Sequence, residues 1–326
     1  LPNNLPSQPS VFVGRQAELD EINDLLAADT VRLLTLTGPG GTGKTRLALQ
    51  SGAESSDRFV DGTYFIDLAP IRDPNSVPAI IARTIGLSES SNGSMLDDLK
   101  DQLGSKTMLL LLDNFEQVTA AAVQVAELLR FCPHLKLLAT SREALRLRGE
   151  YLYPVPPLGL PAVDARPATP QELARYEAVQ LFVERARAVK PDFELTDENA
   201  EAIAELCLRL DGLPLAIELA AARIRLFSPQ ALRQRLGSRL KLLRGGARDL
   251  PERQQTLRDT IDWSYELLEV GEKTLFELLS VFSSGTFEAV EAVVGGIDPP
   301  GDSEIDIDEA LVSLVDKSLV RLSDDG

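Results

Sequence analysis

The stretch VRLLTLTGPGGTGKT, residues 31–45, decides the fold of this chain. Residues 31–37 form a short apolar run that predicts a buried strand. Residues 38–45 match the pattern G-x-x-x-x-G-K-[ST] at every fixed position, and a helical pattern follows over residues 46–53. Because a strand, a glycine-rich turn and a helix follow one another in this order, the sequence predicts a phosphate-binding P-loop.

The P-loop motif suggests a role for each of its residues. Glycine permits backbone angles that turn successive N–H groups toward a phosphate, and the following helix adds the positive end of its dipole. Lys44 is expected to reach the β- and γ-phosphates, and the Thr45 hydroxyl is expected to ligate Mg²⁺. We therefore predict a site for ATP or ADP with Mg²⁺. The nucleotide contacts expected from this motif are Gly38, Pro39, Gly40, Gly41, Thr42, Gly43, Lys44, Thr45 and Arg46.

A second group that binds the metal is expected at the end of another strand. The run MLLLLDN, residues 108–114, places Asp113 directly after an apolar strand. The carboxyl ends of parallel strands meet at one edge of a sheet, where ligands bind. Asp113 is therefore predicted to bind Mg²⁺ together with Thr45. The alternative is that Asp113 caps the segment that follows it.

The residues after Asp113 bear on hydrolysis. Efficient ATPases of this kind commonly carry a second acid at the next position, where it polarises the attacking water. Here that residue is Asn114, which cannot act as a base. Glu116 is the nearest carboxylate and a candidate substitute, although a position two residues further on can point elsewhere. We expect slow hydrolysis.

Arg142 follows the predicted strand at residues 135–140. A guanidinium at that edge of the sheet could bind the γ-phosphate through paired hydrogen bonds. The alternative is a surface arginine that pairs with Glu143 or another nearby carboxylate. Lys44, Asp113, Arg142 and Glu116 are thus the candidate catalytic residues.

Strand-like runs alternate with helical patterns through the first half of the chain. The predicted strands cover residues 31–37, 63–68, 107–113, 135–140 and 151–155. This alternation predicts an α/β P-loop NTPase domain with a parallel sheet covered by helices on both faces. We assign it to residues 13–155, after a linker at residues 1–12 that is rich in proline, asparagine and serine.

The second half of the chain is almost wholly helical in pattern. A proline-rich linker at residues 156–174 precedes a helical domain at residues 175–248. Gly245, Gly246 and Pro251 then mark a boundary before a third domain at residues 249–326.

Charge and composition exclude several classes of function. The net charge is −17, and residues 272–326 carry 13 acids against three bases, so this chain is not expected to bind nucleic acid or an anionic membrane directly. No run approaches the roughly 20 apolar residues of a membrane span, and residues 1–10 lack the pattern of a signal peptide. The two cysteines, Cys132 and Cys207, are interpreted as buried thiols, which favours the cytoplasm.

Several motifs in order give the chain a family resemblance. FVGRQAEL at residues 12–19, the P-loop, LLLLDN, TSR, and LDGLPLAIELAAAR at residues 210–223 occur in sequence. Together with QTLRDTIDWSY at residues 255–265, they resemble the STAND class of signal-transduction ATPases with an NB-ARC-type module. The closest resemblance is to bacterial members found in transcriptional activators and in proteins with adenylate cyclase domains.

The resemblance implies a switch controlled by ATP and ADP. It implies that Val13, Gly14, Arg15 and Pro214 hold the adenine, and that Arg142 is the sensor arginine. It also implies that the third domain is a winged helix, partly truncated at residue 326, which closes over ADP with the helical domain. ATP would loosen this closure and permit homo-oligomerisation or the release of an effector domain, since sensor and effector domains would belong to a longer polypeptide. Pro214 can also be explained simply as the start of a helix.

The chain departs from this family at one further position. Many relatives carry a histidine in the winged helix that contacts the ADP phosphate, whereas the single histidine here is His134, which we interpret as a turn or capping residue. Trp263 is expected at a junction between the helical and winged-helix domains that moves during switching. The alternative function is a small-molecule kinase or another committed P-loop ATPase enzyme.

Overall fold

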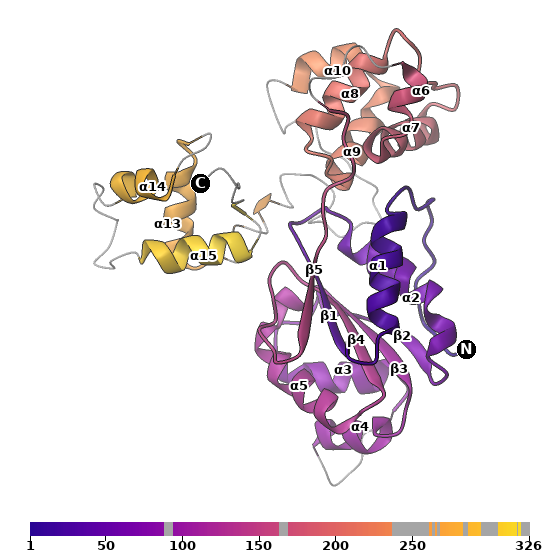
Figure 1. The fold of residues 1–326 in the computed structure, drawn as a ribbon, viewed down its shortest axis with the longest axis vertical. Helices are drawn as coiled ribbons and strands as arrows, with labels where there is room; N and C mark the ends of the chain where they lie inside the picture. The colour runs from indigo at the N-terminus through magenta and orange to yellow at the C-terminus, as the bar shows by residue number, and fades with distance from the viewer. Residues whose placement is uncertain are drawn as a thin grey trace.

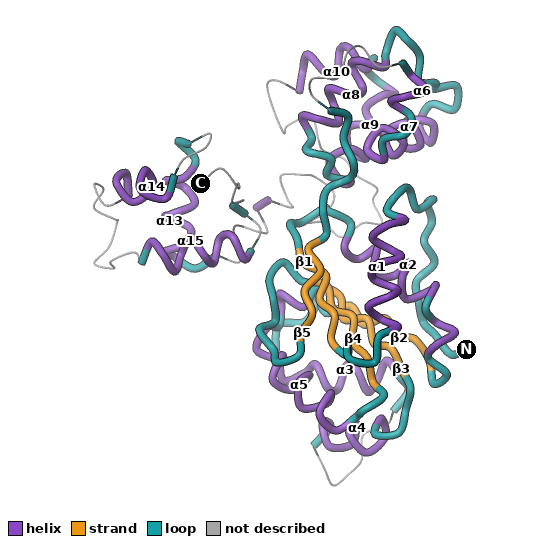
Figure 2. The backbone as a smooth tube through the Cα atoms, in the orientation of Figure 1, coloured by secondary structure: helices purple, strands orange, loops and turns teal. Residues whose placement is uncertain are grey.

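The computed structural model describes residues 1–87, 94–162, 169–236, 261–262, 265, 268–282, 286–294, 306–317 and 319–320. Within these residues, five strands form one parallel sheet in the order β2-β3-β4-β1-β5 (Figures 1 and 2). The strands are β1 (Leu33–Thr37), β2 (Gly62–Asp67), β3 (Met108–Asp113), β4 (Leu135–Thr140) and β5 (Glu150–Pro154). This confirms the predicted α/β architecture. Because β4 lies between β1 and β3, its carboxyl end faces both the P-loop and Asp113.

Helices cover both faces of the sheet, as the apolar strands require. Alternate residues of β3 enter two separate cores: Leu110 and Leu112 pack on one face, and Leu109 and Leu111 on the other. The first core is closed by α3 (Val77–Thr84), α4 (Met95–Leu103) and α5 (Ala122–Phe131). The second is closed by α1 (Gln16–Ala27) and α2 (Lys44–Glu54).

The N-terminal segment, predicted as a linker, lies against the outer edge of the sheet. The carbonyl of Pro2 accepts a hydrogen bond from the backbone N–H of Thr63 in the edge strand β2. The side chain of Asn4 accepts from the N–H of Phe65 at 2.6 Å and donates to the carbonyl of the same residue at 2.9 Å. One side-chain amide thus supplies both bonds that a neighbouring strand would make.

A helical unit follows the sheet. It contains α6 (Pro170–Leu173), α7 (Glu177–Val189), α8 (Ala200–Arg209), α9 (Pro214–Ala221) and α10 (Pro229–Leu236). These helices share one core, which includes Phe182, Ile203 and Ile217. Leu158, from the predicted proline-rich linker, is buried in the same core. The start of that linker is therefore packed on the helical unit.

A third group of helices follows the helical unit. α13 (Val270–Leu279), α14 (Phe287–Val294) and α15 (Ile307–Asp316) surround a small core around Leu275 and Leu314. Trp263 and residues 249–260 and 321–326 of the predicted third domain lie outside the described residues. The described part therefore shows a helical cluster, and the winged helix stays a prediction.

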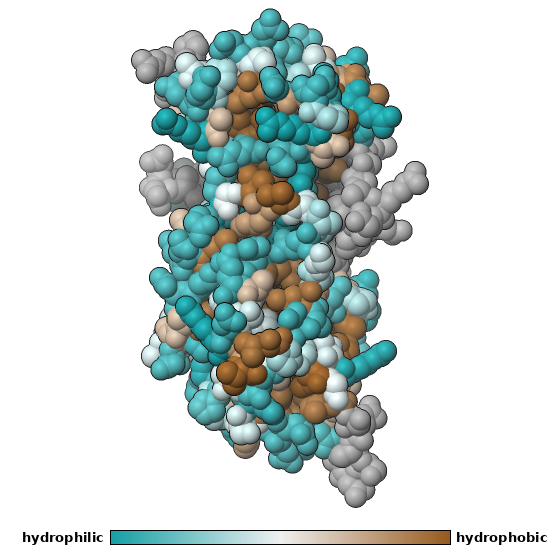
Figure 3. All heavy atoms as spheres, turned by 90° about the vertical axis from the view of Figure 1, so that its right-hand side faces the viewer, coloured by the Kyte–Doolittle hydropathy of each residue, from teal (hydrophilic) through white to brown (hydrophobic). Residues whose placement is uncertain are grey.

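Figure 3 shows one face of the molecule, on which apolar atoms form several patches separated by polar ones. None of the helices in the described part of the chain is long and apolar enough to cross a membrane. Both cysteines are buried and free, and His134 lies in a turn between α5 and β4, as predicted.

Candidate nucleotide site

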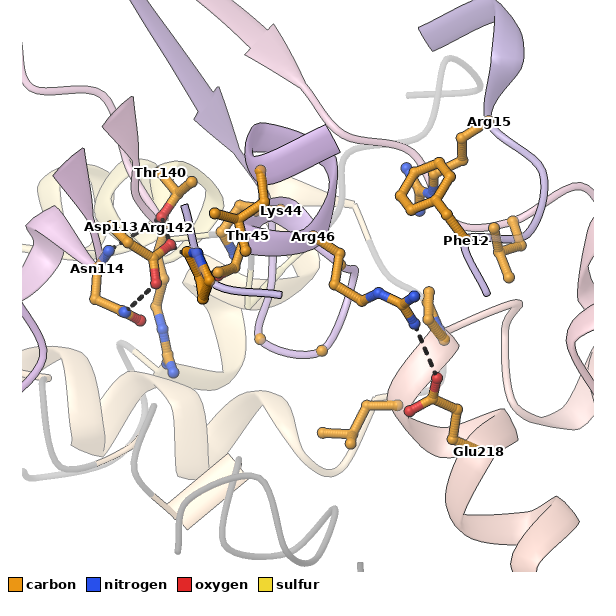
Figure 4. A pocket seen from close by; sticks show the side chains of 18 of the residues that line it. Phe12, Arg15, Lys44, Thr45, Arg46, Asp113, Asn114, Thr140, Arg142 and Glu218 are labelled. Atoms are coloured by element: carbon orange, nitrogen blue, oxygen red, sulfur yellow. Dashed lines mark hydrogen bonds and ion pairs between the residues drawn. The ribbon is translucent and has the colours of Figure 1, made fainter. Parts of the chain in front are cut away.

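A pocket of about 480 Å³ lies where the P-loop faces the helical unit (Figure 4). It unites residues from distant parts of the sequence. Of the residues predicted to form the site, those that line it are Val13, Arg15, Gly40, Gly41, Gly43, Lys44, Thr45, Arg46, Asp113, Glu116, Arg142 and Pro214. Gly14, Gly38, Pro39 and Thr42 are not among the lining residues. The carbonyls of Gly38 and Pro39 accept hydrogen bonds from Lys44, and that of Thr42 accepts one from Arg15.

The P-loop has the backbone geometry that phosphate binding requires. Gly38, Gly41 and Gly43 have φ values of 143°, 83° and 91°, a region that residues with a Cβ rarely enter. The ammonium group of Lys44 donates to the carbonyls of Gly38 at 2.6 Å and Pro39 at 3.0 Å. Burial, and secondarily the nearby Arg142, lower the pKa of Lys44 to about 8 against the attraction of Glu116 and Asp113. A phosphate would replace carbonyl dipoles with a full negative charge.

Asp113 is the centre of a compact polar cluster at the edge of the sheet. Its Oδ1 atom accepts hydrogen bonds from the hydroxyls of Thr45 at 2.7 Å and Thr140 at 2.5 Å. Burial raises the pKa of Asp113 to about 6, although both hydroxyls oppose the shift. Asp113 therefore faces the P-loop helix, and its carboxylate does not cap the turn that follows.

Asn114 is held by the same cluster. Its backbone has a left-handed φ of 62°. Its N–H donates to Thr140 Oγ1 at 3.0 Å, and its side-chain amide donates to Asp113 Oδ2 at 2.6 Å. Asn114 thus fixes the orientation of the neighbouring carboxylate, and as an amide it cannot accept a proton from water at neutral pH.

Glu116 and Arg142 form a buried ion pair on the pocket wall. Arg142 Nε lies 3.4 Å from Glu116 Oε1, and both side chains are only 6% exposed. Glu116 Oε2 is buried and has no hydrogen-bond partner within the described residues. Arg142 is therefore a buried residue facing the pocket, and Glu116 is a carboxylate with which it pairs.

The oxygen atoms of Thr45 and Asp113 suit a hard cation. Their hydroxyl and carboxylate are of the type that Mg²⁺ prefers, and they lie within hydrogen-bond distance of each other. In the described part of the chain, no group of three or more acidic, histidine or cysteine side chains gathers to hold an ion. A Mg²⁺ ion here would take its remaining ligands from phosphate and water, as it usually does.

The other end of the pocket is largely apolar. Phe12, Val13, Leu158, Leu181 and Pro214 contribute to its walls. A nucleotide whose phosphates lie at Thr45 would direct its flat base toward this end, because the base needs apolar faces for stacking. Pro214 occupies the first turn of α9 and also lines the pocket, so both explanations offered for it are compatible.

The helical unit contacts the P-loop directly at this end. The backbone N–H of Leu215 donates to the carbonyl of Gly41 at 3.2 Å. A Cβ added to Gly41 would lie 3.0 Å from the Cβ of Leu215. The tip of the P-loop and the start of α9 are therefore packed without room for a side chain between them.

Arg15 is buried between three segments of the chain. Its Nη2 atom donates to the carbonyls of Thr42 in the P-loop and Pro156 in the linker, each at 2.8 Å. Its Nη1 atom is buried and finds no partner in the described part of the chain. Arg15 thus serves mainly to join these segments, with one donor left for a ligand.

Sequence reasoning missed two charged residues close to Arg46: Glu218, which lines the pocket, and Arg185, which pairs with Glu218. Glu218 of α9 pairs with Arg46 at 3.5 Å and with Arg185 at 2.9 Å. Arg46 also donates to the carbonyls of Ser10 and Val11. The only sequence signal for Glu218 was its place in the segment LAIELAA, where a lone acid interrupts apolar residues.

The fold and the pocket together define a class of protein. A parallel sheet with a G-x-x-x-x-G-K-[ST] turn after one strand, and an aspartate after another strand within reach of the motif threonine, is a P-loop NTPase domain. A Walker-type ATPase of Pyrococcus abyssi has this fold. Its TM-score is 0.57 at 15% sequence identity, over 98% of this chain and 95% of that one.

Two relatives narrow the class further, although no protein-family model matches the chain. A Mycobacterium tuberculosis protein named as an HTH-type transcriptional regulator is 45% identical over 295 residues, 90% of this chain and 31% of that protein. The regulatory protein AfsR of Streptomyces coelicolor is 27% identical over 340 residues, 98% of this chain and 31% of that protein. The chain is therefore a P-loop module related in sequence to AfsR-type bacterial regulators. It spans about a third of the length of these relatives.

Proposed function

We propose that this chain is the nucleotide-dependent switch module of a longer regulator, which binds ATP or ADP with Mg²⁺ and hydrolyses ATP slowly. The observation that carries this proposal is the position of the pocket between the P-loop and α9. The hydrogen bond from the N–H of Leu215 to the carbonyl of Gly41 joins these two elements. A ligand there touches both units. ATP and ADP can therefore favour different arrangements through the contacts that only one of them makes.

The pair of Arg142 and Glu116 supplies that difference. Glu116 faces Arg142 at 3.4 Å and attracts Lys44 as well. A γ-phosphate would compete with Glu116 for both cations, whereas ADP would leave the pair in place. Arg142 would therefore report whether the third phosphate is present.

The same arrangement favours slow hydrolysis. Asn114 is an amide already bonded to Asp113, and Glu116 is already engaged by Arg142 at 3.4 Å. We propose that Thr45 and Asp113 hold Mg²⁺, and that Glu116 must leave Arg142 before it can accept a proton from water. ATP would then persist long enough to act as a signal.

The relatives supply the context of the switch. They are longer regulators, so we propose that sensor and effector domains flank this module in the same polypeptide. Within the chain, we propose the domain ranges given above, with a winged helix at residues 249–326. A cytoplasmic location, with ATP-dependent homo-oligomerisation or effector release as the output, completes the proposal.

Calorimetry of ATP and ADP binding with Mg²⁺, on wild type and Lys44→Ala, tests the proposal. We expect saturable binding of both nucleotides to wild type and a large loss in the variant. Wild-type protein that binds neither nucleotide at any Mg²⁺ concentration would refute it. Rapid ATP turnover that depends on an added acceptor would instead support the alternative, a small-molecule kinase.

A further inference from the structure

Glu177, the first residue of α7, reaches out of the helical unit to the segment that precedes α1. Its Oε1 atom accepts a hydrogen bond from the backbone N–H of Arg15 at 2.5 Å. Its Oε2 atom accepts from the backbone N–H of Gly159 at 3.2 Å. One carboxylate therefore holds two backbone amides from segments 144 residues apart in the sequence, and each would otherwise need another partner.

Gly14 is shaped by this contact. It has a φ of 69°, and a Cβ added to it would lie 2.6 Å from Oε1 and 2.8 Å from Cγ of Glu177. The carboxylate is therefore packed flat against the backbone of residues 13–15, a segment that we call the strap. Neither Gly14 nor Glu177 lines the pocket, whereas Val13 and Arg15 on either side of Gly14 do.

The linker is fixed by the same set of contacts. The N–H of Leu158 donates to the carbonyl of Gly212 at 3.0 Å, and the N–H of Ala178 donates to the carbonyl of Gly159 at 3.3 Å. Arg15 completes the set by donating to the carbonyl of Pro156. Strap, linker and helical unit thus meet at Glu177, and all three contribute walls to the apolar end of the pocket.

We propose that Glu177 is a positioning residue for the base of the bound nucleotide, an inference that rests on the proposed function. By holding the N–H of Arg15, it fixes Val13 against the helical core and keeps Arg15, whose Nη1 has no hydrogen-bond partner within the described residues, in the pocket wall. Glu177 makes no contact with the phosphate end, whose residues come from the sheet and the P-loop. Its removal should therefore weaken binding of the base and spare binding of the phosphates.

The test compares Mg·ATP with inorganic tripolyphosphate plus Mg²⁺, by calorimetry, on wild type, Glu177→Ala and Glu177→Gln. We expect Glu177→Ala to weaken ATP binding about tenfold and to leave tripolyphosphate binding unchanged. Glu177→Gln keeps one oxygen acceptor and should lose less. Glu184→Ala, which removes a carboxylate two turns along the same helix, is the matched control and should change neither affinity.

Three outcomes would overturn the proposal: an equal loss for both ligands, no loss for ATP, or wild-type protein that binds the two ligands equally well. If wild type binds neither ligand, the proposed function itself has failed. Hydrogen exchange of the strap amides in nucleotide-free protein gives a readout that needs no ligand. Glu177→Ala should speed exchange at Arg15, and unchanged exchange there would also refute the role of Glu177.

Discussion

The two ends of the pocket are built in different ways. At the phosphate end, Lys44, Asp113 and Thr140 come from the P-loop and adjoining strands of one sheet, and none is more than 8% exposed. At the base end, the strap, the linker and the helical unit meet through single side chains such as Arg15 and Glu177. A sheet fixes the first end in advance, whereas the second exists only while the helical unit is docked. Movement of that unit should therefore change the contacts to the base before it changes the contacts to the phosphates.

The largest expected effect comes from breaking the phosphate end at Lys44. Lys44→Ala should weaken ATP binding on the order of 100-fold, since a hydrogen bond to a charged group contributes about 1.5–3 kcal/mol. Calorimetry measures this loss. The melting temperature of the free variant should not fall, because burial already lowers the pKa of Lys44 to about 8 and makes its charge costly. A variant that binds ATP normally would contradict this assignment.

Asp113→Asn sharpens the comparison at the same end. The substitution keeps the size of the side chain and removes the charge that attracts Mg²⁺. ATP affinity should therefore lose most of its dependence on Mg²⁺, and at saturating Mg²⁺ it should be about tenfold weaker than in wild type. Titration of ATP at several Mg²⁺ concentrations measures this. Asp67→Asn is the control, because Asp67 also lines the pocket but is exposed and accepts no bond from Thr45. Equal effects of the two variants would argue against Asp113 as the ligand.

Gly14→Ala breaks the base end through the backbone. Alanine at a φ of 69° costs about 1–2 kcal/mol, and its Cβ would also collide with Glu177. We expect ATP affinity to fall about tenfold while tripolyphosphate affinity is kept. Gly271→Ala is a control without such crowding, since an added Cβ there meets no atom within 4 Å. A loss of tripolyphosphate binding in Gly14→Ala would show that the two ends are not independent.

Glu218→Gln should have the smallest effect. Glu218 links Arg46 of the α/β domain to Arg185 of the helical unit, but these side chains are 16–31% exposed and screened by solvent. Such pairs contribute less than about 1 kcal/mol, so nucleotide release should quicken about twofold, and less at high salt. Stopped-flow measurement of release tests this. Glu205→Gln, which breaks ion pairs inside the helical unit alone, is the control. An equal change in the rate of nucleotide release in this variant would contradict a role for Glu218 between the α/β domain and the helical unit.

The phosphate end could be read from the sequence because its signals are local. A strand, a turn and a helix within residues 31–53 fixed the P-loop, and five leading apolar residues placed Asp113 at a strand end. The strands at residues 107–113 and 135–140 were predicted to within one residue at each end. Strand β5, with mostly exposed side chains, lay within one residue of its predicted bounds because prolines and a glycine delimit it.

The contacts that position the base end of the pocket could not be predicted from local sequence in the same way. Glu177 lies 162 residues from Arg15, and nothing in its local sequence distinguishes it from a solvated acid in the first turn of a helix. The ion pair between Arg142 and Glu116 escaped for a similar reason, because the direction of Glu116 depends on the left-handed backbone of Asn114. Contacts of this kind are set by how elements pack, and periodicity carries no information about them.

The bonds from Pro2 and Asn4 to β2 have a consequence for the behaviour of the chain in solution. An uncovered edge strand offers free donors and acceptors to another molecule, and it is a common start of aggregation. Here the first residues occupy that edge, and the same segment continues to Phe12 at the pocket. Deleting the first few residues of this chain, including Pro2 and Asn4, would therefore have two effects. It would expose the edge strand β2 to other molecules, and it would leave one wall of the pocket less well fixed.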